Sequence, residues 1–511
     1  MDLNKEIGQH LIVGFPGTEM SPEFIESVKK YKIGNVILFA HNIKSEVQLK
    51  KLISNINNLI IDEVGIPPFI TIDQEGGMVT RLGEDSINIP GAMALTATQN
   101  IDYLEKCIQI NSSQLQALGI NCNLAPVLDV NCNKSNPVIG VRSFSDKAEI
   151  VATMGAKVIR EYEKNNLLCV AKHFPGHGDT SADSHLDLPK VEKSYKELEK
   201  TEFPPFKKAI EVGVPAIMTS HILYPSLDSS SLPATMSKEI ITNFLRKKLD
   251  FKGLVFSDCM EMKAISNYYG TVNGIIAALK AGADLLFISH HPKIAIEACI
   301  QIEYSFDNGD FNKESWTDSL NRILDYKKKY IGSSSLIKLD KERDSKTVYN
   351  IRKASLTLVK GHRQALGSCP LFVSPPLFRA TNITSEAINL SFAEEIGKLI
   401  KGISITVSSD PTEEEIKGCL EKVDKSKITS IVFGTYNAHL YKGQLKLVKA
   451  FREFKVPITV VALRNPYDLK YLEDVSDCSL AAYEYTKDEI KIIAEFLIDG
   501  FRPTGKLPVE I

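Results

Sequence analysis

The sequence predicts an α/β protein in which a (β/α)8, TIM-like barrel is followed by a smaller α/β sandwich domain. Two observations support this fold class. Eight short apolar runs alternate with helix-like segments over residues 11–289, and the alternation resumes beyond a charged, serine-rich segment at 325–350. Alternating strands and helices are typical of a parallel sheet covered by helices, and eight such units form the closed barrel. A doubly wound open sheet is the competing interpretation.

Each apolar run is expected to form one buried parallel strand. The runs are short, several are rich in Val and Ile, and polar residues or glycine follow them, as in strands covered on both faces. In chain order they span residues 11–15, 35–39, 69–73, 121–129, 168–173, 216–221, 253–258 and 285–289. Helices are expected between them, for example at 45–61, 150–165 and 237–249, with Ser237 as the N-cap of the last.

The second domain is expected to follow a linker. Residues 325–350 are charged and contain Gly-Ser-Ser-Ser at 332–335, a composition typical of linkers. A helix is expected at about 349–360, and apolar runs follow at 371–374, 403–408, 429–433 and 458–462. We therefore expect a barrel domain at 1–335, a linker with a connecting helix at 336–360, and a sandwich domain at 361–511.

Charge and cysteine content limit the class of partner and the compartment. The 61 basic and 63 acidic residues give a net charge of −2, so there is no electrostatic basis for binding nucleic acid or an anionic membrane. No stretch reaches 18 apolar residues, and the N-terminus lacks the basic and apolar segments of an export signal. The nine cysteines include no CxxC pair, which disfavours a disulfide framework or a zinc ribbon. These features predict a cytoplasmic protein.

Polar residues end five of the expected strands. Because the carboxyl ends of barrel strands carry the chemistry of this fold, these residues are candidates for a common site. Any strand must end at something polar, so a single such residue would mean little, but five in register favour function. The residues are Asp73, Asp129, Lys172 with His173, His221 and Asp258.

The densest polar cluster is Lys-His-Phe-Pro-Gly-His-Gly-Asp-Thr at 172–180, followed by Asp183 and His185. A metal site is disfavoured, because the spacing matches neither HExxH nor CxxC and a lysine lies inside the cluster. A polar surface loop is the second interpretation. The third is acid/base catalysis: Asp183 and His185 are two residues apart and could hydrogen-bond on a turn, so that the carboxylate sets the imidazole pKa near neutrality.

Three further groups have candidate roles. Asp258 could act as a nucleophile or stabilise a cation, although it could also simply cap the next helix; its neighbour Cys259 is expected to pack in the core. The carboxylates and paired glycines at 71–77, with Arg81, suit contacts to sugar hydroxyls better than a metal ion. Arg142 is a candidate bidentate ligand for an anion, or else an ordinary surface arginine.

Taken together, these motifs resemble glycoside hydrolase family 3, and specifically its bacterial β-N-acetylglucosaminidase branch. The most specific match is KHFPGHGDT…DSH at 172–185. The supporting matches are TIDQEGG at 71–77, LAPVLDV at 124–130, GVRSFS at 140–145, PATMS at 233–237, FSDCMEM at 256–262, AGADLL at 281–286 and GKLPV at 505–509. The resemblance covers nearly the whole chain in order.

The resemblance implies a role for each matching residue. Asp258 would be the nucleophile of a retaining reaction, and His185 assisted by Asp183 the acid/base. The terminal sugar would be bound by Asp73, Arg142, Lys172 and His173, with His221 near the pocket. It further implies an exo-β-N-acetylglucosaminidase that needs no cofactor or metal and acts on small carbohydrates such as muropeptide or chitin fragments.

Two alternatives to hydrolysis remain open from the sequence. A neutral histidine base repels phosphate less than a carboxylate would, so the same residues could catalyse phosphorolysis. The other is a sugar-binding protein without activity, which the presence of both Asp258 and the Asp183–His185 pair disfavours. Two-domain members of the family are often exported, which sets this resemblance against the predicted cytoplasmic location.

Overall fold

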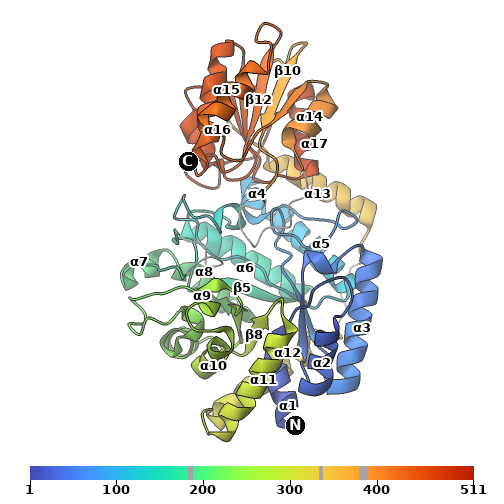
Figure 1. The fold of residues 1–511 in the computed structure, drawn as a ribbon, viewed down its shortest axis with the longest axis vertical. Helices are drawn as coiled ribbons and strands as arrows, with labels where there is room; N and C mark the ends of the chain where they lie inside the picture. The colour runs from blue at the N-terminus through green and yellow to red at the C-terminus, as the bar shows by residue number, and fades with distance from the viewer. Residues whose placement is uncertain (182–187, 333–337, 379–389) are drawn as a thin grey trace.

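The computed structural model describes residues 1–181, 188–332, 338–378 and 390–511. The first part of the chain forms a closed barrel of eight parallel strands in the order β1 to β8, and the later part forms a separate sheet that lies above it in Figure 1. The predicted fold class is confirmed. The alternative of an open, doubly wound sheet for the first part is wrong, because β1 pairs with β8 and closes the cylinder.

All eight barrel strands begin within one residue of the expected start, and seven of them end within two residues of the expected end. The strands are β1 (Leu11–Val13), β2 (Asn35–Leu38), β3 (Phe69–Ile72), β4 (Cys122–Asn123), β5 (Leu168–Phe174), β6 (Ala216–Thr219), β7 (Leu254–Cys259) and β8 (Leu285–Ile288). The helices around them include α1 (Leu3–Gln9), α2 (Pro22–Tyr31), α3 (Glu46–Val64), α4 (Ala92–Ala97), α5 (Ile101–Leu118), α6 (Ala148–Lys164), α7 (Tyr195–Lys200), α8 (Phe203–Glu211), η4 (Glu239–Lys248), α9 (Lys263–Ser266), α10 (Thr271–Ala281), α11 (Pro292–Asp307) and α12 (Lys313–Tyr330).

The exception is β4, which was expected at 121–129 and has only two residues in the ladder. Pro126 interrupts the run, and proline has no N–H to donate to a neighbouring strand. One isolated bridge, between Val127 and Lys172, continues the pairing beyond it. The helix expected at 237–249 with Ser237 as N-cap begins at Glu239 with Lys238 as its N-cap, although the Ser237 hydroxyl accepts a hydrogen bond from the Ile240 N–H.

The amino-terminal end of the barrel is built for stability. The Asp284 carboxylate, fully buried, bonds Arg246 at 2.6 Å and Arg322 at 2.5 Å. His10, at the end of α1, is also fully buried; its Nδ1 lies 2.8 Å from the Asp284 carbonyl oxygen and its ring 4.1 Å from that of Trp316. The carbonyl fixes the proton on Nδ1, and Nε2 has no hydrogen-bond partner. Burial therefore lowers the pKa of His10 to about 4, although Asp284 partly opposes it.

We expect His10 to make the barrel acid-sensitive. Its pKa is lower in the folded chain than in the unfolded chain, so the unfolded state binds the proton first and stability falls as pH drops from about 6.5 towards 4. The loss at pH 5 should be about 2 kcal/mol. His10→Asn keeps a nitrogen donor but cannot titrate, so its unfolding free energy should change less between pH 7 and pH 5. Urea unfolding followed by the fluorescence of Trp316 measures this, and equal pH dependence in both proteins would contradict it.

The second domain is a six-stranded sheet in the order β11-β10-β12-β13-β14-β9, in which β9 alone is antiparallel to its neighbour. Its strands are β9 (Thr357–Gly361), β10 (Pro370–Ser374), β11 (Ile403–Thr406), β12 (Ser430–Thr435), β13 (Ile458–Ala462) and β14 (Cys478–Ala481). The helices on its two faces are α14 (Phe392–Ile400), α15 (Glu413–Glu421), α16 (Lys442–Ala450) and α17 (Lys487–Asp499).

Two elements of this part differ from expectation. The helix expected at about 349–360 is α13 (Lys341–Ser355), whose N-cap Asp340 accepts a hydrogen bond from the Arg343 N–H inside the charged segment. The residues that follow it form β9 rather than the end of a helix, because Thr357, Leu358 and Val359 pair with the edge of the sheet. Strand β14 had not been expected, since Ser479 and Ala481 give it little β propensity.

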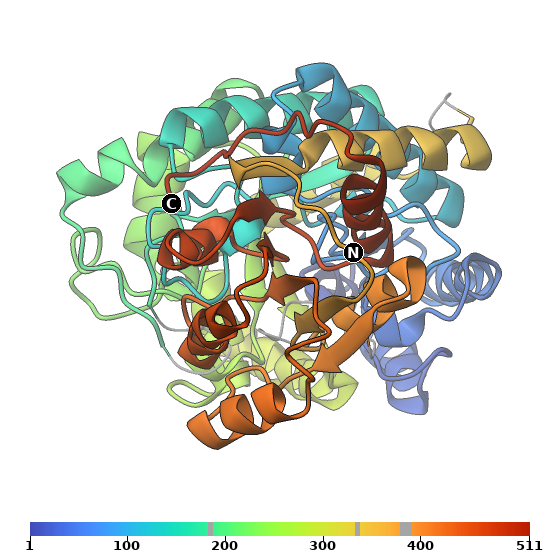
Figure 2. The same ribbon diagram turned by 90° about the horizontal axis from the view of Figure 1, so that it is seen from above.

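The second domain packs on the carboxyl-terminal face of the barrel. Figure 2 shows it lying over the barrel, seen from above. The loops after β3 and β4 make the contacts: Glu484 accepts the Gly91 N–H at 2.7 Å, and Asn131 donates to the Tyr467 hydroxyl at 2.6 Å. Met78 and Val141 from the same loops belong to the hydrophobic core of the second domain. The two domains therefore meet at the barrel end where the predicted site lies.

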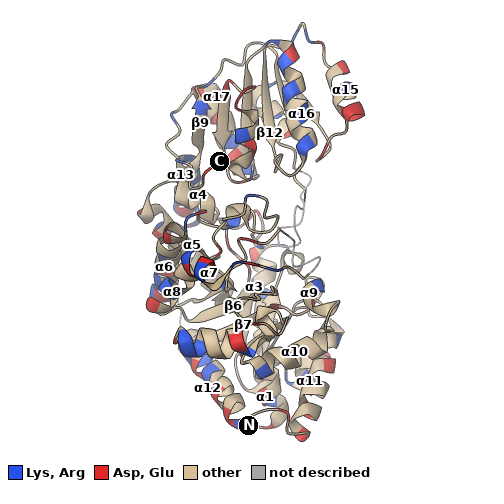
Figure 3. Ribbon diagram, turned by 90° about the vertical axis from the view of Figure 1, so that its left-hand side faces the viewer, with Lys and Arg blue, Asp and Glu red and all other residues tan. Residues whose placement is uncertain are grey.

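Basic and acidic residues are interspersed along the helices of both domains (Figure 3), in keeping with the balanced charge. Among the residues that the structure describes, no helix has the length and apolar character needed to cross a membrane.

Candidate active site

Strand geometry brings the predicted residues to one end of the barrel. Asp73 directly follows β3. Lys172 and His173 are near the end of β5, and Asp258 is near the end of β7. Strands of a parallel barrel all end at the same face, so these side chains surround a common opening. Asp73, Lys172 and His173 are buried and Asp258 is partly exposed.

A network of buried ion pairs joins three of the predicted sugar-binding residues. The Lys172 ammonium lies 2.7 Å from Asp73 Oδ1 and 2.7 Å from Glu75 Oε1. Arg142 donates two hydrogen bonds to the Glu75 carboxylate, from Nε at 2.9 Å and from Nη2 at 2.8 Å. Arg81 Nη2 lies 3.6 Å from the other Asp73 oxygen. Such a bidentate, fully hydrogen-bonded network holds its members in one geometry.

Glu75 is the centre of this network, and it was expected only to contact sugar hydroxyls. Burial would raise the pKa of its carboxyl, but Arg142 and Lys172 outweigh burial and hold that pKa far below its ordinary value. Glu75 is therefore a permanent anion, and it neutralises the two cations on either side. Glu75 belongs to the motif at 71–77, but its partners come from elsewhere in the chain: Lys172 from the end of β5 and Arg142 from the segment between β4 and α6.

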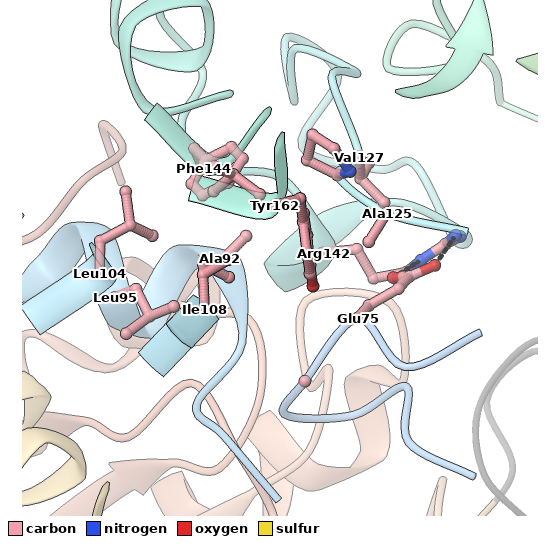
Figure 4. A pocket seen from close by; sticks show the side chains of 13 residues that line it. Glu75, Ala92, Leu95, Leu104, Ile108, Ala125, Val127, Arg142, Phe144 and Tyr162 are labelled. Atoms are coloured by element: carbon pink, nitrogen blue, oxygen red, sulfur yellow. Dashed lines mark hydrogen bonds and ion pairs between the residues drawn. The ribbon is translucent and has the colours of Figure 1, made fainter. Parts of the chain in front are cut away.

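Apolar side chains shield the Glu75–Arg142 pair from one side. Figure 4 shows a pocket beside this pair, lined mainly by residues of α4, α5, α6 and the segment after β4. Its apolar lining comprises Ala92, Leu95, Leu104, Ile108, Ala125, Pro126, Val127, Phe144, Val158 and Tyr162. The pocket excludes polar groups from the back of the ion pair, which strengthens the attraction between its charges. It does not include Asp73, Lys172 or Asp258, so we do not assign it to the sugar.

Asp129 positions the loop that follows β5. Its Oδ2 lies 2.6 Å from His173 Nδ1, and its Oδ1 accepts the N–H of His177 at 2.6 Å. Burial would raise the pKa of the Asp129 carboxyl, but His173 and His177 outweigh burial and lower it. Burial and the neighbouring His173 lower the pKa of His177 to about 4, so His177 is neutral. With Nδ1 held by Asp129, Nε2 is the His173 nitrogen available to a ligand.

Close backbone packing fixes the same loop. A side chain at Gly178 would place its Cβ 1.6 Å from the carbonyl oxygen of Val130, so only glycine fits there. Asn136 adds a hydrogen bond to the carbonyl oxygen of His177 at 2.8 Å. The loop that leads to Asp183 and His185 therefore begins from a rigid base. Asp183 and His185, predicted as the acid/base pair, lie outside the described residues.

Asp258 is oriented by its own backbone and by the loop after β6. Its Oδ1 accepts the Cys259 N–H at 2.7 Å, and His221 Nε2 lies 2.9 Å from the Cys259 carbonyl oxygen. His221 is held in turn by Thr235, 2.9 Å from its Nδ1. Burial, with Glu261 nearby, raises the pKa of the Cys259 thiol to about 12, so this cysteine is a neutral packing group as expected.

The chemistry that these residues can perform is that of a carboxylate facing a rigid, hydroxyl-binding polar wall. Asp258 is a partly exposed carboxylate at the rim, whereas Asp73, Glu75 and Asp129 are buried and each is paired with a cationic or imidazole group. Within residues 1–181, 188–332, 338–378 and 390–511, no three His, Cys, Asp or Glu side chains are grouped so that they could hold a metal ion.

Comparison with known proteins gives a consistent result. A model of the "Glycosyl hydrolase family 3 N terminal domain" matches residues 2–326. Beta-hexosaminidase A of Pseudoalteromonas piscicida is 35% identical over 62% of this chain, which spans 57% of that relative's length. A beta-hexosaminidase of Nitrosomonas eutropha is 31% identical over 59% of this chain and 86% of its own.

Several solved structures cover the whole chain. A family 3 beta-N-acetylglucosaminidase from Paenibacillus sp. str. FPU-7 has a TM-score of 0.92 and 33% identity, and covers 100% of this chain and 99% of its own. A beta-glucoside phosphorylase, BglX, has a TM-score of 0.82 over 100% of this chain and 94% of its own, at 20% identity, and this likeness concerns the fold alone.

Proposed function

The chain belongs to glycosyl hydrolase family 3 and is a glycoside hydrolase; from this premise we propose that it is a retaining exo-β-N-acetylglucosaminidase. The observation that carries the proposal is the rigid network of Asp73, Lys172, Glu75 and Arg142 at the strand ends, beside the rim carboxylate Asp258. A retaining glycosidase needs one carboxylate beneath the anomeric carbon and one acid at the leaving oxygen.

The proposed first step is attack by Asp258 on the anomeric carbon of the terminal N-acetylglucosamine. The bond from Asp258 to carbon forms as the bond to the leaving oxygen breaks, and His185 gives its proton to that oxygen. A water molecule then attacks the anomeric carbon of the glycosyl-enzyme, and neutral His185 takes a proton from that water. The bond between Asp258 and the sugar breaks, which frees Asp258. Asp183 would hold the His185 ring and stabilise its charged form.

The remaining residues would hold the sugar. Asp73 accepts from hydroxyl groups, and Lys172 and His173 Nε2 are the polar groups beside it; their buried partners Glu75 and Asp129 keep them in place. Because Glu75 already occupies both arms of the Arg142 fork, Arg142 would act on the sugar with its remaining donors and by fixing the wall. Binding one terminal ring in a rigid wall suits cleavage from the end of a chain.

The same ion pairs favour water over phosphate as the acceptor. Phosphorolysis would profit from free positive charge beside the anomeric carbon, but Lys172 lies between Asp73 and Glu75, and Arg142 is paired with Glu75. We therefore place hydrolysis first. The natural substrate that we propose is a fragment of peptidoglycan or chitin. All nine cysteines are free thiols, which supports a reducing, cytoplasmic compartment and a role in recycling cell-wall fragments.

The assay that tests the proposal uses an aryl β-N-acetylglucosaminide with and without millimolar phosphate. We expect release of the aryl alcohol together with free β-N-acetylglucosamine, identified by NMR before it mutarotates. A first product of α configuration would contradict retention. Faster turnover in phosphate, with N-acetylglucosamine 1-phosphate as the product, would replace the hydrolase by a phosphorylase.

The acid/base pair has a signature in the choice of leaving group. His185→Ala should lower kcat/KM about a hundredfold for natural oligosaccharides, whose leaving groups must be protonated, and much less for activated aryl glycosides. Asp183→Ala should act in the same direction with a shifted pH profile. A series of aryl glycosides of increasing leaving-group pKa measures this, and equal losses across the series would show that His185 is not the acid.

A further inference from the structure

Arg464, two residues beyond the end of β13, is an arginine whose charge no acid neutralises in the part of the chain that the structure describes. Its side chain is fully buried. Nη1 lies 3.4 Å from the Tyr436 hydroxyl, and the guanidinium carbon is 5.7 Å from the Tyr436 ring centroid. Nε and Nη2 have no hydrogen-bond partner. Among the described residues, no Asp or Glu forms an ion pair with it.

The other buried arginines show how unusual this is. Arg142 is paired with Glu75, Arg352 with Glu484 and Arg81 with Asp73. Burying a cation without a partner is expensive, and one weak hydrogen bond and one aromatic ring offset only part of that cost. Among the described residues, three of the four buried arginines are paired with an acid and Arg464 is not. We infer that its guanidinium is available to a group that is not part of the chain.

The position of Arg464 connects it to the proposed sugar site. The next residue, Asn465, packs against the barrel segment that carries Arg142: a Cβ added at Gly140 would lie 2.4 Å from Asn465 Oδ1. Asn465 also donates to the Asn437 side chain at 2.9 Å, which ties the ends of β12 and β13 together. The carboxyl ends of these parallel strands face the barrel, and ligands of open α/β sheets bind at that edge.

Other unmatched polar atoms gather in the same region. Thr435 Oγ1 at the end of β12, Asn465 Oδ1 and Asp468 Oδ2 are buried without partners, and so is Asn131 Oδ1 on the barrel side. Such atoms are rare in a folded chain; the amide and carboxylate oxygens among them only accept hydrogen bonds and do not themselves bind an anion, so the unmatched donors are those of Arg464. Because the unmatched donors belong to the positively charged Arg464, the ligand should be an anion. The guanidinium group matches the oxygens of a carboxylate or phosphate.

We propose that Arg464 is an oxyanion-binding residue through which the second domain recognises an anionic group next to the sugar site. This rests on the proposed function for its substrate. Two sources of the oxyanion share this chemistry: a carboxylate carried by the aglycone, as on an N-acetylmuramic acid residue, and free inorganic phosphate. In either case the barrel binds the terminal sugar and Arg464 selects what accompanies it.

The kinetic experiment compares two β-1,4-linked disaccharides, neutral N,N′-diacetylchitobiose and N-acetylglucosaminyl-N-acetylmuramic acid. Arg464→Met should lower kcat/KM for the muramic acid substrate at least tenfold, mainly through KM, and leave chitobiose within twofold. Arg464→Lys should recover part of the loss. Lys134→Met is the matched control, because Lys134 is an exposed cation over the Tyr467 ring at the contact between the two domains. This variant should change kcat/KM for neither substrate.

The binding experiment needs no turnover. Inorganic phosphate, at ionic strength held constant with chloride, should raise the thermal midpoint of the wild type in a saturable way if phosphate is the ligand, and should not raise that of Arg464→Met. Without ligand, Arg464→Met should be at least as stable as the wild type, because an unpaired buried charge has been replaced by an apolar chain.

Each outcome decides the proposal. A selective loss on the muramic acid substrate assigns Arg464 to the aglycone carboxylate, and loss of the phosphate shift assigns it to free phosphate. Equal losses on both disaccharides with no phosphate effect, or a marked fall in the ligand-free thermal midpoint of Arg464→Met, would give Arg464 a structural role and overturn the proposal. If the wild type cleaves no N-acetylglucosaminide, the proposed function fails, and the phosphate titration still tests Arg464.

Discussion

Asp258→Ala should abolish turnover, with kcat lower by about four orders of magnitude or more, while the chain stays folded. The residue is partly exposed at the end of β7, where its Oδ1 accepts a hydrogen bond from the neighbouring Cys259 N–H. Its removal deletes the group that we propose attacks the anomeric carbon, at a partly exposed position where a small side chain should be tolerated. Steady-state kinetics with an aryl N-acetylglucosaminide, with circular dichroism as the check on folding, measure this.

Labelling identifies the same residue independently of mutation. A fluorinated sugar that slows the second step should leave a glycosyl group on the peptide that contains Asp258, and mass spectrometry locates it. Cys259→Ser is the matched control: it lies on the same strand end, its thiol pKa is raised to about 12 by burial, and its loss should change kcat little. Label on any other carboxylate, or a large loss in Cys259→Ser with normal activity in Asp258→Ala, would refute the assignment.

The positions of the strand ends could be predicted because the signals are local. An apolar run followed by a polar residue predicts where a buried parallel strand stops, and this was enough to place Asp73, Lys172 and Asp258 at one face. Strand β4 shows where this local prediction fails. Leu124 and Val127 continue the apolar run, but the regular pairing stops before Pro126. Only the structure shows that Val127 still pairs with Lys172 of β5.

The partners of these residues could not be predicted from local patterns. Glu75 stands in a motif that suggests sugar binding, yet it pairs with Lys172 near the end of β5 and with Arg142 in the segment between β4 and α6. Whether a carboxylate binds substrate or neutralises a neighbour depends on contacts between residues far apart in sequence. For the same reason Arg464 could not be identified from the sequence, because its role is inferred from the absence of an acid around it among the described residues.

Glu75→Gln should be the most disruptive conservative change in the barrel. The amide keeps the shape of the side chain but leaves Arg142 buried without a carboxylate, and Lys172 with Asp73 alone. Removing one partner of a buried pair costs about 3–5 kcal/mol of stability. Because the network also forms the proposed sugar wall, KM should rise and kcat/KM should fall. Denaturant unfolding and kinetics on the same preparations measure the two effects.

A matched variant separates stability from binding. Glu484→Gln breaks the equally buried pair with Arg352 of α13; the Glu484 carboxylate also accepts the Gly91 N–H, but it is not paired with Lys172 or Arg142. It should cost a similar unfolding free energy but change KM less than Glu75→Gln does. If both variants raise KM equally, the kinetic effect of Glu75 comes from lost stability and not from the sugar wall.

The double variant Glu75→Leu with Arg142→Met carries the argument further. Replacing both members of a buried ion pair by apolar side chains of similar size is often neutral or stabilising, so the double variant should recover most of the stability that Glu75→Gln loses. It should not recover activity, because neither the donors of Arg142 nor the anion that holds Lys172 remains. Recovery of stability without recovery of kcat/KM would mean that this network is kept for the sugar; recovery of both would mean that it only fills the barrel top.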